Sequence, residues 1–548
     1  MLYYGCDTET YNETIVKDGK EIRYIGLKSI QLCNSEEQNY FTSDDFTQSD
    51  ESIRYEISKK FIDFLDTRKE DVKVAFFNMT FDVSQFLYYL IAHSGYSLVH
   101  EYTPRLSKGQ MSFLETDRKL FSVKFRSYKS GYQIQFIDIA NFAVASTLDQ
   151  VSESWLNKRK VSIESKIFPK KPATEIEKKY ALQDAILTYE LYVKFLQESV
   201  IEKNTYTIAG RTIKHFKQYC KEEYLTSFEY LMFGTEDKDE IVSMKEEFER
   251  ELRCGVRGGI CQAFHKGVYE DVTHIDARSM YPTQCVRDFV PFGGLLKEEP
   301  NALHTKIVYP SGWYTLKPNC VPCVQWTNKA NLERYHYIND YECGDYVNDF
   351  YLDGSYPIWQ EEYNIIKKQY NVEHEEIEKT WYILLKENII LKSYVNMLYE
   401  GKKNNKGAKR LYYKYLLNAL YGKFLTRPDG VTIDYFEESD GWHRTKLASE
   451  KSTFYLPLGN CIGCISLLFA PILTPYTTKL WIAMMGRVTL MSKIISIPSE
   501  NFLYCDTDSM IFKGNIMPDI NIGKELGDWS IEKEHVKVNV VGPKTYQE

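Results

Sequence analysis

The sequence predicts a multidomain protein of the α+β class. Its 548 residues exceed what a single hydrophobic core normally organises, so several domains are expected. Hydrophobic residues make up 43% of the chain and charged residues 26%, which is the balance of a soluble globular protein. Strand-like apolar runs, such as residues 2–6 and 501–503, occur together with a helix-like stretch at 410–422. Sheets and helices are therefore both expected.

A polar turn near the C-terminal end of the chain predicts a metal-binding hairpin. The stretch 504–509 reads YCDTDS and lies between the apolar runs 501–503 and 510–512. Two apolar runs joined by a tight polar turn predict a β-hairpin. Because side chains alternate along a strand, Asp506 and Asp508 are expected on one face, where their charges favour a hard divalent cation. A solvated hairpin tip is the alternative for such a pair on its own.

Two further stretches favour a site over a solvated turn. Residues 272–275 predict a strand that leads into DARSMYP, which adds a third carboxylate, Asp276, and an aromatic ring, Tyr281. A helix over 410–422 would bring five residues onto one face: Arg410, Lys414, Asn418, Tyr421 and Gly422. Two cations, an amide, an aromatic ring and bare backbone suit a triphosphate and a flat base.

The first 200 residues carry a second set of acidic residues. Asp7 and Glu9 are two apart at the end of the strand predicted at 2–6, so they are expected on one face. The stretch NMTFD at 78–82 follows a strand-like run, and a helix would place Tyr180 and Asp184 on one face. Hydrolysis of a phosphodiester by two metal ions needs about four carboxylates. The candidates are Asp7, Glu9, Asp82 and Asp184.

In their order along the chain, these motifs resemble those of a known family. The three C-terminal stretches resemble motifs A, B and C of family B DNA polymerases, and the N-terminal ones resemble the Exo motifs of proofreading 3′–5′ exonucleases. The resemblance implies an RNase H-like exonuclease domain followed by a right-hand polymerase with an antiparallel palm and helical fingers. Within family B, the chain resembles the protein-primed polymerases of bacteriophages with linear genomes. The implied reaction is template-directed addition of dNMP to a primer 3′ hydroxyl.

The resemblance implies roles for the polymerase residues. Asp276 and Asp508 would hold two Mg²⁺ ions, which Mn²⁺ can replace, and Asp506 would support the site electrostatically. Tyr281 would stack under the sugar and exclude a 2′ hydroxyl. The residues facing the nucleotide and the nascent base pair would be Arg410, Lys414, Asn418, Tyr421 and Gly422. Ala419 stands where the family usually has serine, which removes one hydroxyl and leaves the chemistry intact.

It also implies roles for the exonuclease residues. The four acidic candidates would hold two further Mg²⁺ ions, and Tyr180 would orient the attacking water. Lys160 is the best match for the family's lysine at the scissile phosphate, with Lys158 as the alternative. Three residues would hold the frayed 3′ end, the last by stacking on a base: Thr10, Asn78 and Phe81.

Other positions resemble the family's DNA contacts. The stretch VRGG at 256–259 resembles its YxGG motif, with Val256 in place of the tyrosine, and its glycines would let the backbone approach a phosphate. The helix predicted before motif C carries Thr474, Thr478, Lys479 and Arg487, among which the primer-binding arginine stays unassigned. The predicted DNA contacts are Arg257, Gly258, Gly259, Lys402, Tyr504, Lys544 and Tyr546, the last two forming a KxY motif.

Insertions on both sides of motif B resemble terminal-protein regions. KPNCVPCVQ at 317–325 is similar to the first, and the hairpin-like part of 431–454 with YLPLG after it is similar to the second. A terminal protein is therefore an expected partner, beside DNA and dNTPs. The expected domains are an exonuclease (1–200), a first palm part (201–287), the first insertion (288–389), fingers (390–430), the second insertion with palm (431–500) and a last palm part (501–548).

Charge and cysteines set the remaining expectations. The net charge is −8, so nucleic-acid binding would depend on local basic runs at 158–171 and 402–410. Twelve scattered cysteines, with no signal peptide or membrane-spanning stretch, indicate reduced thiols and a cytoplasmic protein, in the host cytoplasm if it is viral. Two CxxC pairs, Cys320/Cys323 and Cys461/Cys464, leave a zinc site as an alternative.

Two alternatives for the function stay open at this point, and two explanations for the missing thumb. The chain could be a family B polymerase that uses an ordinary primer, or a polymerase remnant that only binds DNA or a protein partner. No thumb domain follows Lys544 and Tyr546. A second polypeptide could supply it, or the sequence could be a truncated copy. As given, the chain is expected to extend a primer distributively.

Overall fold

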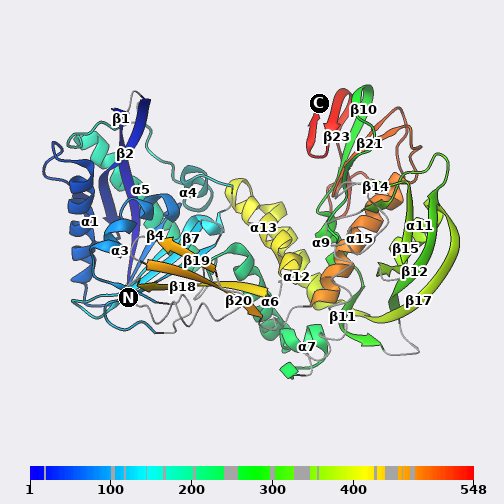
Figure 1. Ribbon diagram of the computed structural model, residues 1–548, viewed down its shortest axis with the longest axis horizontal. Coiled ribbons are helices and arrows are strands. Elements are labelled where there is room, and N and C mark those ends of the chain that lie inside the picture. Colours follow the sequence, from blue (N-terminus) through cyan, green and yellow to red (C-terminus); the bar gives the residue numbers. More distant parts are fainter. Residues whose placement is uncertain are drawn as a thin grey trace. The chain divides into compact units, whose positions relative to one another are not determined.

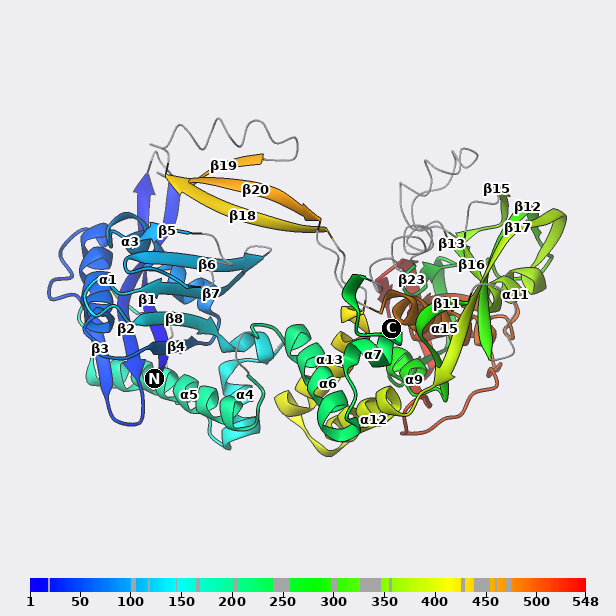
Figure 2. The same ribbon diagram turned by 90° about the horizontal axis from the view of Figure 1, so that it is seen from below.

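The structure is a computed structural model of the chain (Figures 1 and 2). It describes residues 1–548 apart from 18–19, 100–104, 117–118, 144, 164–167, 202–204, 240–256, 297–302, 326–345, 354–356, 425–428, 438–453, 459–460 and 470–474. The chain divides into two compact units. The first contains Met1–Thr212, Gly401–Leu416 and Arg427–Ala470, and the second contains Ile213–Glu400, Leu417–Thr426 and Pro471–Glu548.

The first unit is built on an eight-stranded mixed sheet. Its strands follow the order β3-β2-β1-β4-β8-β7-β6-β5, and β4 pairs in parallel with both β1 and β8. The strands are β1 (Leu2–Lys17), β2 (Lys20–Cys33), β3 (Gln38–Thr42), β4 (Val72–Phe76), β5 (Ser97–Leu98), β6 (Gln110–Thr116), β7 (Lys119–Arg126) and β8 (Gln133–Asp138). The helices around this sheet are α1 (Asp50–Asp66), α2 (Met79–Ser84), α3 (Leu87–Ala92), α4 (Leu148–Leu156) and α5 (Glu175–Gln197).

Alternation along β1 decides which side chains meet α1 and which meet α5. Tyr4 and Cys6 belong to the apolar core that includes Phe61 of α1. Tyr3 points the other way, and its ring lies 5.6 Å from the ring of Tyr192 on α5. Since side chains alternate along a strand, the odd-numbered Asp7 shares the α5 side of the sheet.

A separate three-stranded sheet also belongs to the first unit (Figure 2). β20 (Cys461–Phe469) is its central strand, with β18 (Asp429–Glu437) and β19 (Phe454–Leu458) on either side. The hairpin-like stretch expected over 431–454 falls mostly on residues 438–453, which lie outside the described residues, and at its start β18 pairs with β20. Cys461 and Cys464 are in β20, whose side chains are also not described, so the four-cysteine zinc alternative stays untested.

The second unit holds a six-stranded antiparallel sheet. Its order is β24-β23-β10-β22-β21-β9, with β9 (Cys261–Ala263), β10 (Gly267–Ala277), β21 (Phe502–Asp506), β22 (Ser509–Lys513), β23 (Trp529–Gly542) and β24 (Thr545–Gln547). One face packs on helix α15 (Tyr476–Ile494) through a core that includes Ile275, Leu490, Ile494 and Phe502. The predicted hairpin around the YCDTDS stretch is confirmed as β21 and β22.

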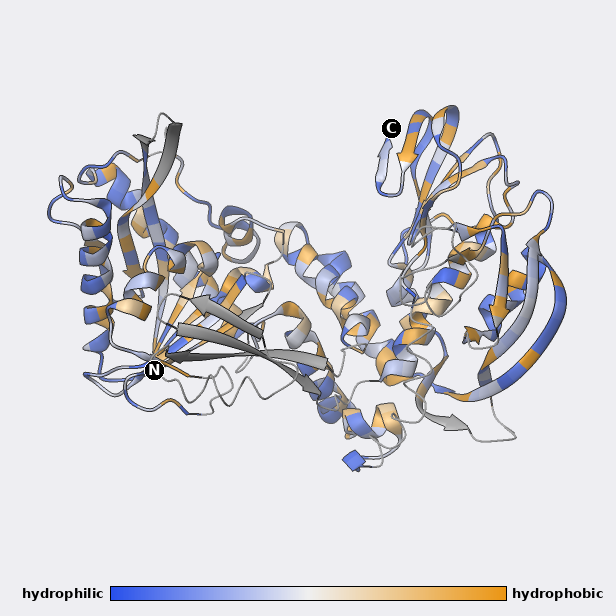
Figure 3. Ribbon diagram, in the orientation of Figure 1, coloured by the Kyte–Doolittle hydropathy of each residue, from blue (hydrophilic) through white to orange (hydrophobic). Residues whose placement is uncertain are grey.

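A five-stranded antiparallel sheet follows β10 in the chain. It contains β11 (Phe289–Leu296), β12 (His304–Leu316), β15 (Asp349–Asp353), β16 (Ile358–Trp359) and β17 (Tyr370–Glu387). The same part of the chain also forms helix α11 (Gln360–Gln369) and a separate two-stranded sheet of β13 (Val324–Gln325) and β14 (Tyr346–Val347). Strand β17 is largely hydrophilic (Figure 3), and residues 373–379 are exposed.

The remaining helices are α6 (Ile208–Tyr224), α7 (Phe228–Phe233), α9 (Met280–Cys285), α12 (Ile390–Asn404) and α13 (Gly407–Lys423). The helix predicted over 410–422 is confirmed as α13, through which the division between the two units passes. Among the described residues, no helix combines the length and apolar character that crossing a membrane requires.

Candidate active sites

An acidic cluster lies where β1 meets α5 in the first unit. Asp7 and Glu9 of β1 and Asp184 of α5 each offer an oxygen within 4.8 Å of the others. Among the residues that the structure describes, no other group of three acidic, histidine or cysteine side chains brings its ligand atoms this close together. The sequence predicted both residues at the end of a strand, but β1 continues beyond them to Lys17. Parallel pairing with β4 stops at Cys6, just before them.

One hydrogen bond to Asp82 and another at the start of its helix hold this carboxylate next to the cluster. Thr8 of β1 donates its hydroxyl to Asp82 Oδ1 at 2.6 Å. Helix α2, which carries Asp82, begins after Asn78, a residue with a left-handed φ of 81°. The Asp138 carboxylate at the end of β8 accepts the N–H of Asn78 at 3.1 Å and that of Ala140 at 2.9 Å. Thr8 and Asp138 thus position Asp82, and neither was predicted as a site residue.

Burial and mutual repulsion make these carboxylates hard to ionise. Burial and the charge of Asp184 raise the pKa of Glu9 to about 8. Burial raises the pKa of Asp82 to about 7, against the hydrogen bond from Thr8, which lowers it. Burial, followed by Asp82 and Glu9, holds the pKa of Asp7 well above its usual range. A bound cation would favour the ionised forms of all of them.

Lys160 supplies a positive charge at this cluster. Its ammonium forms an ion pair with Asp184 and lies 5.5 Å from the ring centroid of Tyr180, which is 8% exposed. Lys158, the alternative, instead pairs with Glu190 at 2.7 Å on the surface. Of the residues predicted to hold a 3′ end, Thr10 is half-buried, Asn78 begins α2, and Phe81 presents a ring that is 43% exposed.

Three carboxylates gather at one end of the sheet in the second unit. Ser509 of β22 stands opposite Asp276 of β10 on one side and opposite Asp506 of β21 on the other. Paired residues in antiparallel strands share a face, so Asp276 and Asp506 point to the same side. Asp508 lies in the two-residue turn after Thr507, which has a φ of 61°. The position of Asp508 is therefore set by the turn, and not by alternation along the strand of Asp506 as the sequence predicted.

Lys544 neutralises Asp506. Its ammonium donates to both carboxylate oxygens, at 2.7 and 2.5 Å, and this bonding raises the pKa of Lys544. The Tyr504 hydroxyl contacts both partners. It accepts the backbone N–H of Lys544 at 3.2 Å and donates to Asp506 Oδ2 at 3.4 Å. Tyr504 is fully buried, so its predicted contact with DNA is wrong. Tyr546, 37% exposed, packs against it with ring centroids 5.1 Å apart.

Two aromatic rings meet beside the carboxylates. Tyr281 of α9 and Tyr421 of α13 have ring centroids 4.9 Å apart and an angle of 38° between their planes. On the predicted face of α13, Arg410, Lys414, Asn418 and Gly422 are all exposed, and Tyr421 is half-buried. Lys402, Arg410 and Lys414 belong to the first unit, whereas Asn418, Tyr421 and Gly422 belong to the second.

The described part of the VRGG stretch packs against the motif C turn. A Cβ added at Gly259 would lie 2.7 Å from Thr507 Oγ1 and 2.9 Å from Tyr281 Oη, so any other residue there would have to displace these side chains. The N–H of Thr507 also donates to the Ile260 carbonyl at 2.5 Å. Gly258 is exposed with open space around it. Val256, like Thr474, lies outside the described residues.

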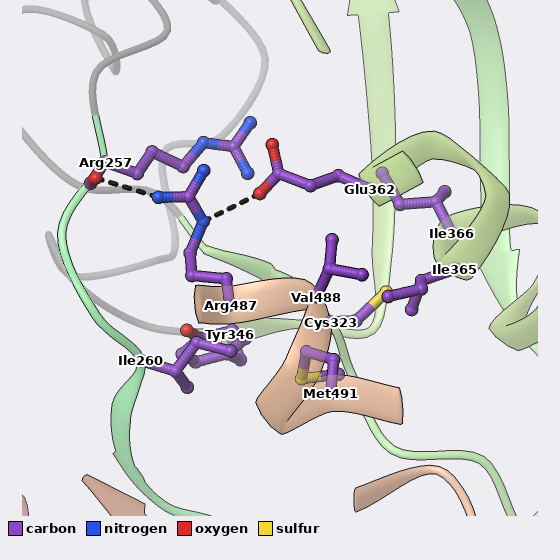
Figure 4. A pocket seen from close by; sticks show the side chains of 10 residues that line it. All are labelled: Arg257, Ile260, Cys323, Tyr346, Glu362, Ile365, Ile366, Arg487, Val488 and Met491. Atoms are coloured by element: carbon purple, nitrogen blue, oxygen red, sulfur yellow. Dashed lines mark hydrogen bonds and ion pairs between the residues drawn. The ribbon is translucent and has the colours of Figure 1, made fainter. Parts of the chain in front are cut away.

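A buried arginine binds the backbone of the VRGG stretch. Arg487 of α15 donates to the carbonyl of Arg257 at 2.8 Å and to Glu362 of α11 at 2.7 Å (Figure 4). A cavity of about 20 Å³ lies beside them. The Arg257 side chain is 8% exposed and extends toward Glu362, so the prediction that it pairs with a DNA phosphate is wrong. Arg487 was noted in the sequence without a role, and Glu362 was not predicted.

Comparisons with known proteins agree with this arrangement. The family model described as DNA polymerase type B, organellar and viral, matches residues 38–522. The chain belongs to this family. Family B polymerases use divalent metal ions, and the cluster of Asp7, Glu9 and Asp184 offers the hard oxygen donors that such ions prefer.

Among curated relatives, the DNA polymerase of Bacillus phage phi29 is 24% identical over 375 residues, which are 63% of this chain and 58% of that protein. The polymerase of Bacillus phage Nf is 25% identical over 315 residues, 54% of this chain and 49% of the relative. The matched stretch of this family B chain thus spans about half the length of these relatives.

The fold is also shared with a solved structure. Phi29 DNA polymerase, in a complex with primer-template DNA and incoming nucleotides, superposes on 99% of this chain and 86% of its own, with a TM-score of 0.74 and 16% identity. The predicted multidomain α+β fold of the family is therefore confirmed.

Proposed function

We propose that the chain is a DNA-directed DNA polymerase with a separate 3′–5′ exonuclease site. One observation carries the polymerase assignment: Asp276 and Asp506 flank Ser509 on one face of an antiparallel sheet, with Asp508 in the adjoining turn. This places three carboxylates from two distant sequence motifs at one sheet end. Family membership over residues 38–522 supports the same activity.

Both acidic sites suit a hard divalent cation, and we propose two Mg²⁺ ions at each, with Mn²⁺ as a substitute. Their donors are carboxylate oxygens, the ligands that Mg²⁺ prefers. Such ions supply charge stabilisation for the attacking and leaving oxygens of a phosphoryl group. Asp276 and Asp508 would hold them in the second unit, while Asp506 is already engaged by Lys544.

The remaining residues of the second unit would bind and select the substrates. Tyr281 would lie under the incoming sugar, where its ring excludes a 2′ hydroxyl. Exposed Gly258 would let the backbone approach DNA, Lys544 and Tyr546 would hold the primer end, and the half-buried Lys402 would contact DNA from α12. The triphosphate and the nascent pair would meet the α13 face of Arg410, Lys414, Asn418, Tyr421 and Gly422.

In the first unit, the residues would trim a mispaired 3′ end. Asp7, Glu9, Asp82 and Asp184 would supply the metal ligands. Tyr180 would orient the attacking water, and Lys160 would stabilise charge on the scissile phosphate. Exposed Phe81 would stack on a terminal base, next to Asn78 and Thr10.

We assign residues 1–200 to the exonuclease, 201–287 and 501–548 to the palm, and 390–430 to the fingers. The two insertions, 288–389 and 431–500, would receive a terminal protein, and the last also contributes helix α15 to the palm. Phi29 DNA polymerase is solved with primer-template DNA and nucleotides, so we propose the same partners here. If the chain is viral, its replication would take place in the host cytoplasm.

A labelled primer-template tests the proposal. With dNTPs and Mg²⁺ the purified chain should extend the primer, and without dNTPs it should shorten single strands from the 3′ end. EDTA should stop both reactions. Retarded migration of DNA without any incorporation would identify a DNA-binding remnant and overturn the assignment.

Protein priming needs its own assay. The chain, its candidate terminal protein and a labelled dNTP are incubated with template, and the proteins are separated under denaturing conditions. Protein priming predicts label on a Ser, Thr or Tyr hydroxyl of the terminal protein. Efficient extension of a DNA primer with no labelled protein would instead show an ordinarily primed family B polymerase.

A further inference from the structure

A lysine with no role in the proposed chemistry sits against the two tyrosine rings of the second unit. Lys479 is in the first turn of α15, and its Nζ lies 4.1 Å from the ring centroid of Tyr421 and 5.5 Å from that of Tyr281. At these distances an ammonium is attracted to the negative face of an aromatic ring, and more strongly when it is shielded from water. Lys479 therefore contacts both members of the ring pair.

The backbone also approaches Tyr281 closely at two glycines. Gly486 follows Lys479 by seven residues, two helical turns, so both face the same side of α15. A Cβ at Gly486 would lie 2.9 Å from Tyr281 Cε1, which shows how closely the ring lies on the helix. At the hydroxyl end of the ring, a Cβ at Gly259 would likewise lie 2.9 Å from Tyr281 Oη. Tyr281 is thus confined by α15, the Gly259 backbone and the Tyr421 ring, whose place Lys479 helps to hold.

We propose that Lys479 is a positioning residue that fixes the Tyr281–Tyr421 ring pair and thereby sets how strongly the site rejects ribonucleotides. The inference rests on the proposed polymerase function and on Tyr281 as the residue under the sugar. A ring that shifts by a fraction of an ångström would leave room for a 2′ hydroxyl. The charge that holds the ring would therefore act on sugar selection without touching the substrate.

The charge of Lys479 can be changed by pH alone. Burial lowers the pKa of Lys479 to about 8, Arg487 adds to this, and Cys285 opposes it. The other groups that face it keep their charge state between pH 7 and 9. Burial raises the pKa of Cys285 to about 12 and raises those of Tyr281 and Tyr421 further above their ordinary values, while Arg487 stays cationic.

Two substitutions separate charge from packing. Lys479→Met keeps an unbranched side chain that is one atom shorter and removes the charge, and Lys479→Arg keeps a charge that does not titrate. The measurement is kcat/KM for a dNTP and for the matching rNTP on one primer-template, in each variant. We expect the dNTP preference to fall about tenfold in Lys479→Met and to stay within about twofold in Lys479→Arg. Lys493→Met, at the far end of the same helix, should leave it unchanged.

A pH series and a double variant give readouts that loss of packing alone would not change. The wild-type preference should decline from pH 7 to pH 9, while that of Lys479→Arg stays flat. In a Tyr281→Val background, Lys479→Met should have no further effect, because the lysine acts through that ring. An unchanged preference in Lys479→Met, or equal added loss without the Tyr281 ring, would overturn the inference. Failure of wild-type incorporation would instead overturn the proposed function.

Discussion

Arg487 and Glu362 form a buried ion pair, 2.7 Å from Nε to Oε1, that joins α15 to α11. Their side chains are 7% and 14% exposed. The same guanidinium donates to the carbonyls of Arg257 and Gly258, so the pair also fixes the entry to β9. A charged group removed from water this far depends on its partner, which makes the pair sensitive to the loss of either side.

Glu362→Ala should strongly destabilise the second unit. It leaves the Arg487 guanidinium buried without its counter-charge, a change that typically costs about 3–5 kcal/mol in the free energy of unfolding. Glu362→Gln keeps a hydrogen-bond acceptor and should cost less. Urea unfolding measures both. The exposed Glu376→Ala should change the free energy of unfolding by no more than about 0.5 kcal/mol. Equal small effects at both glutamates would show that the pair is solvated.

Asp508→Asn should abolish primer extension and leave 3′–5′ degradation of single strands intact. The substitution removes a charge from the second unit and keeps the size of the side chain, so the acidic cluster of the first unit is unaffected. Extension of a labelled primer is measured beside degradation in the same preparation. Glu534→Gln, an exposed change on β23 of the same sheet, serves as the control and should retain both activities. Near wild-type extension by Asp508→Asn would show that Asp508 is not part of the polymerase site.

The double change Asp7→Ala with Glu9→Ala should remove degradation and raise misincorporation, while extension persists. Two of the three closely spaced oxygen donors disappear, so the cluster can no longer hold a divalent cation. A second effect is expected on stability: losing carboxylates that repel each other in a buried site should raise the melting temperature of the metal-free protein. The exposed Glu36→Ala serves as the control. Unchanged degradation of a labelled single strand would rule out this cluster.

Above pH 8, the wild type should gain stability relative to Lys479→Met. The pKa of Lys479 is about 8 in the folded protein, against 10.5 ordinarily. Between these values the unfolded chain binds more protons than the folded one, so stability rises with pH, by up to about 1.4 kcal/mol per pH unit. Below pH 8 both states carry the proton, and the cost of burying it is constant. A pH-independent difference between the two proteins would show that Lys479 is solvated.

Local patterns in the sequence were enough to predict the elements that carry the candidate sites. The apolar runs around Asp506 and Asp508 predicted the hairpin, and the four-residue spacing from Arg410 to Gly422 predicted an open helix face. The polar residues after Asp7 hid the full length of β1, because a strand that continues beyond the sheet core has no apolar alternation to mark it.

Contacts between distant parts of the chain left no such pattern. Nothing near Asp506 indicates that Lys544 will bind it, and nothing near Glu362 indicates Arg487. The same limit explains the two wrong DNA contacts. Tyr504 and Arg257 are residue types that often bind nucleic acid, but burial depends on the rest of the fold and cannot be read from their immediate neighbours.

The order in which strands occur along the chain sets when each site can form during synthesis. On the α1 side of the eight-stranded sheet, the buried core residues that the structure describes run from Tyr4 to Phe136, so this core can fold soon after it leaves the ribosome. The second sheet must wait, because β10 pairs with β22 and β23, which are made far later. A nascent chain would thus form the sheet that carries the proposed exonuclease residues before the sheet that carries the proposed polymerase residues. Ribosome stalling between residues 212 and 508 would leave the first sheet complete and the second sheet without β22 and β23.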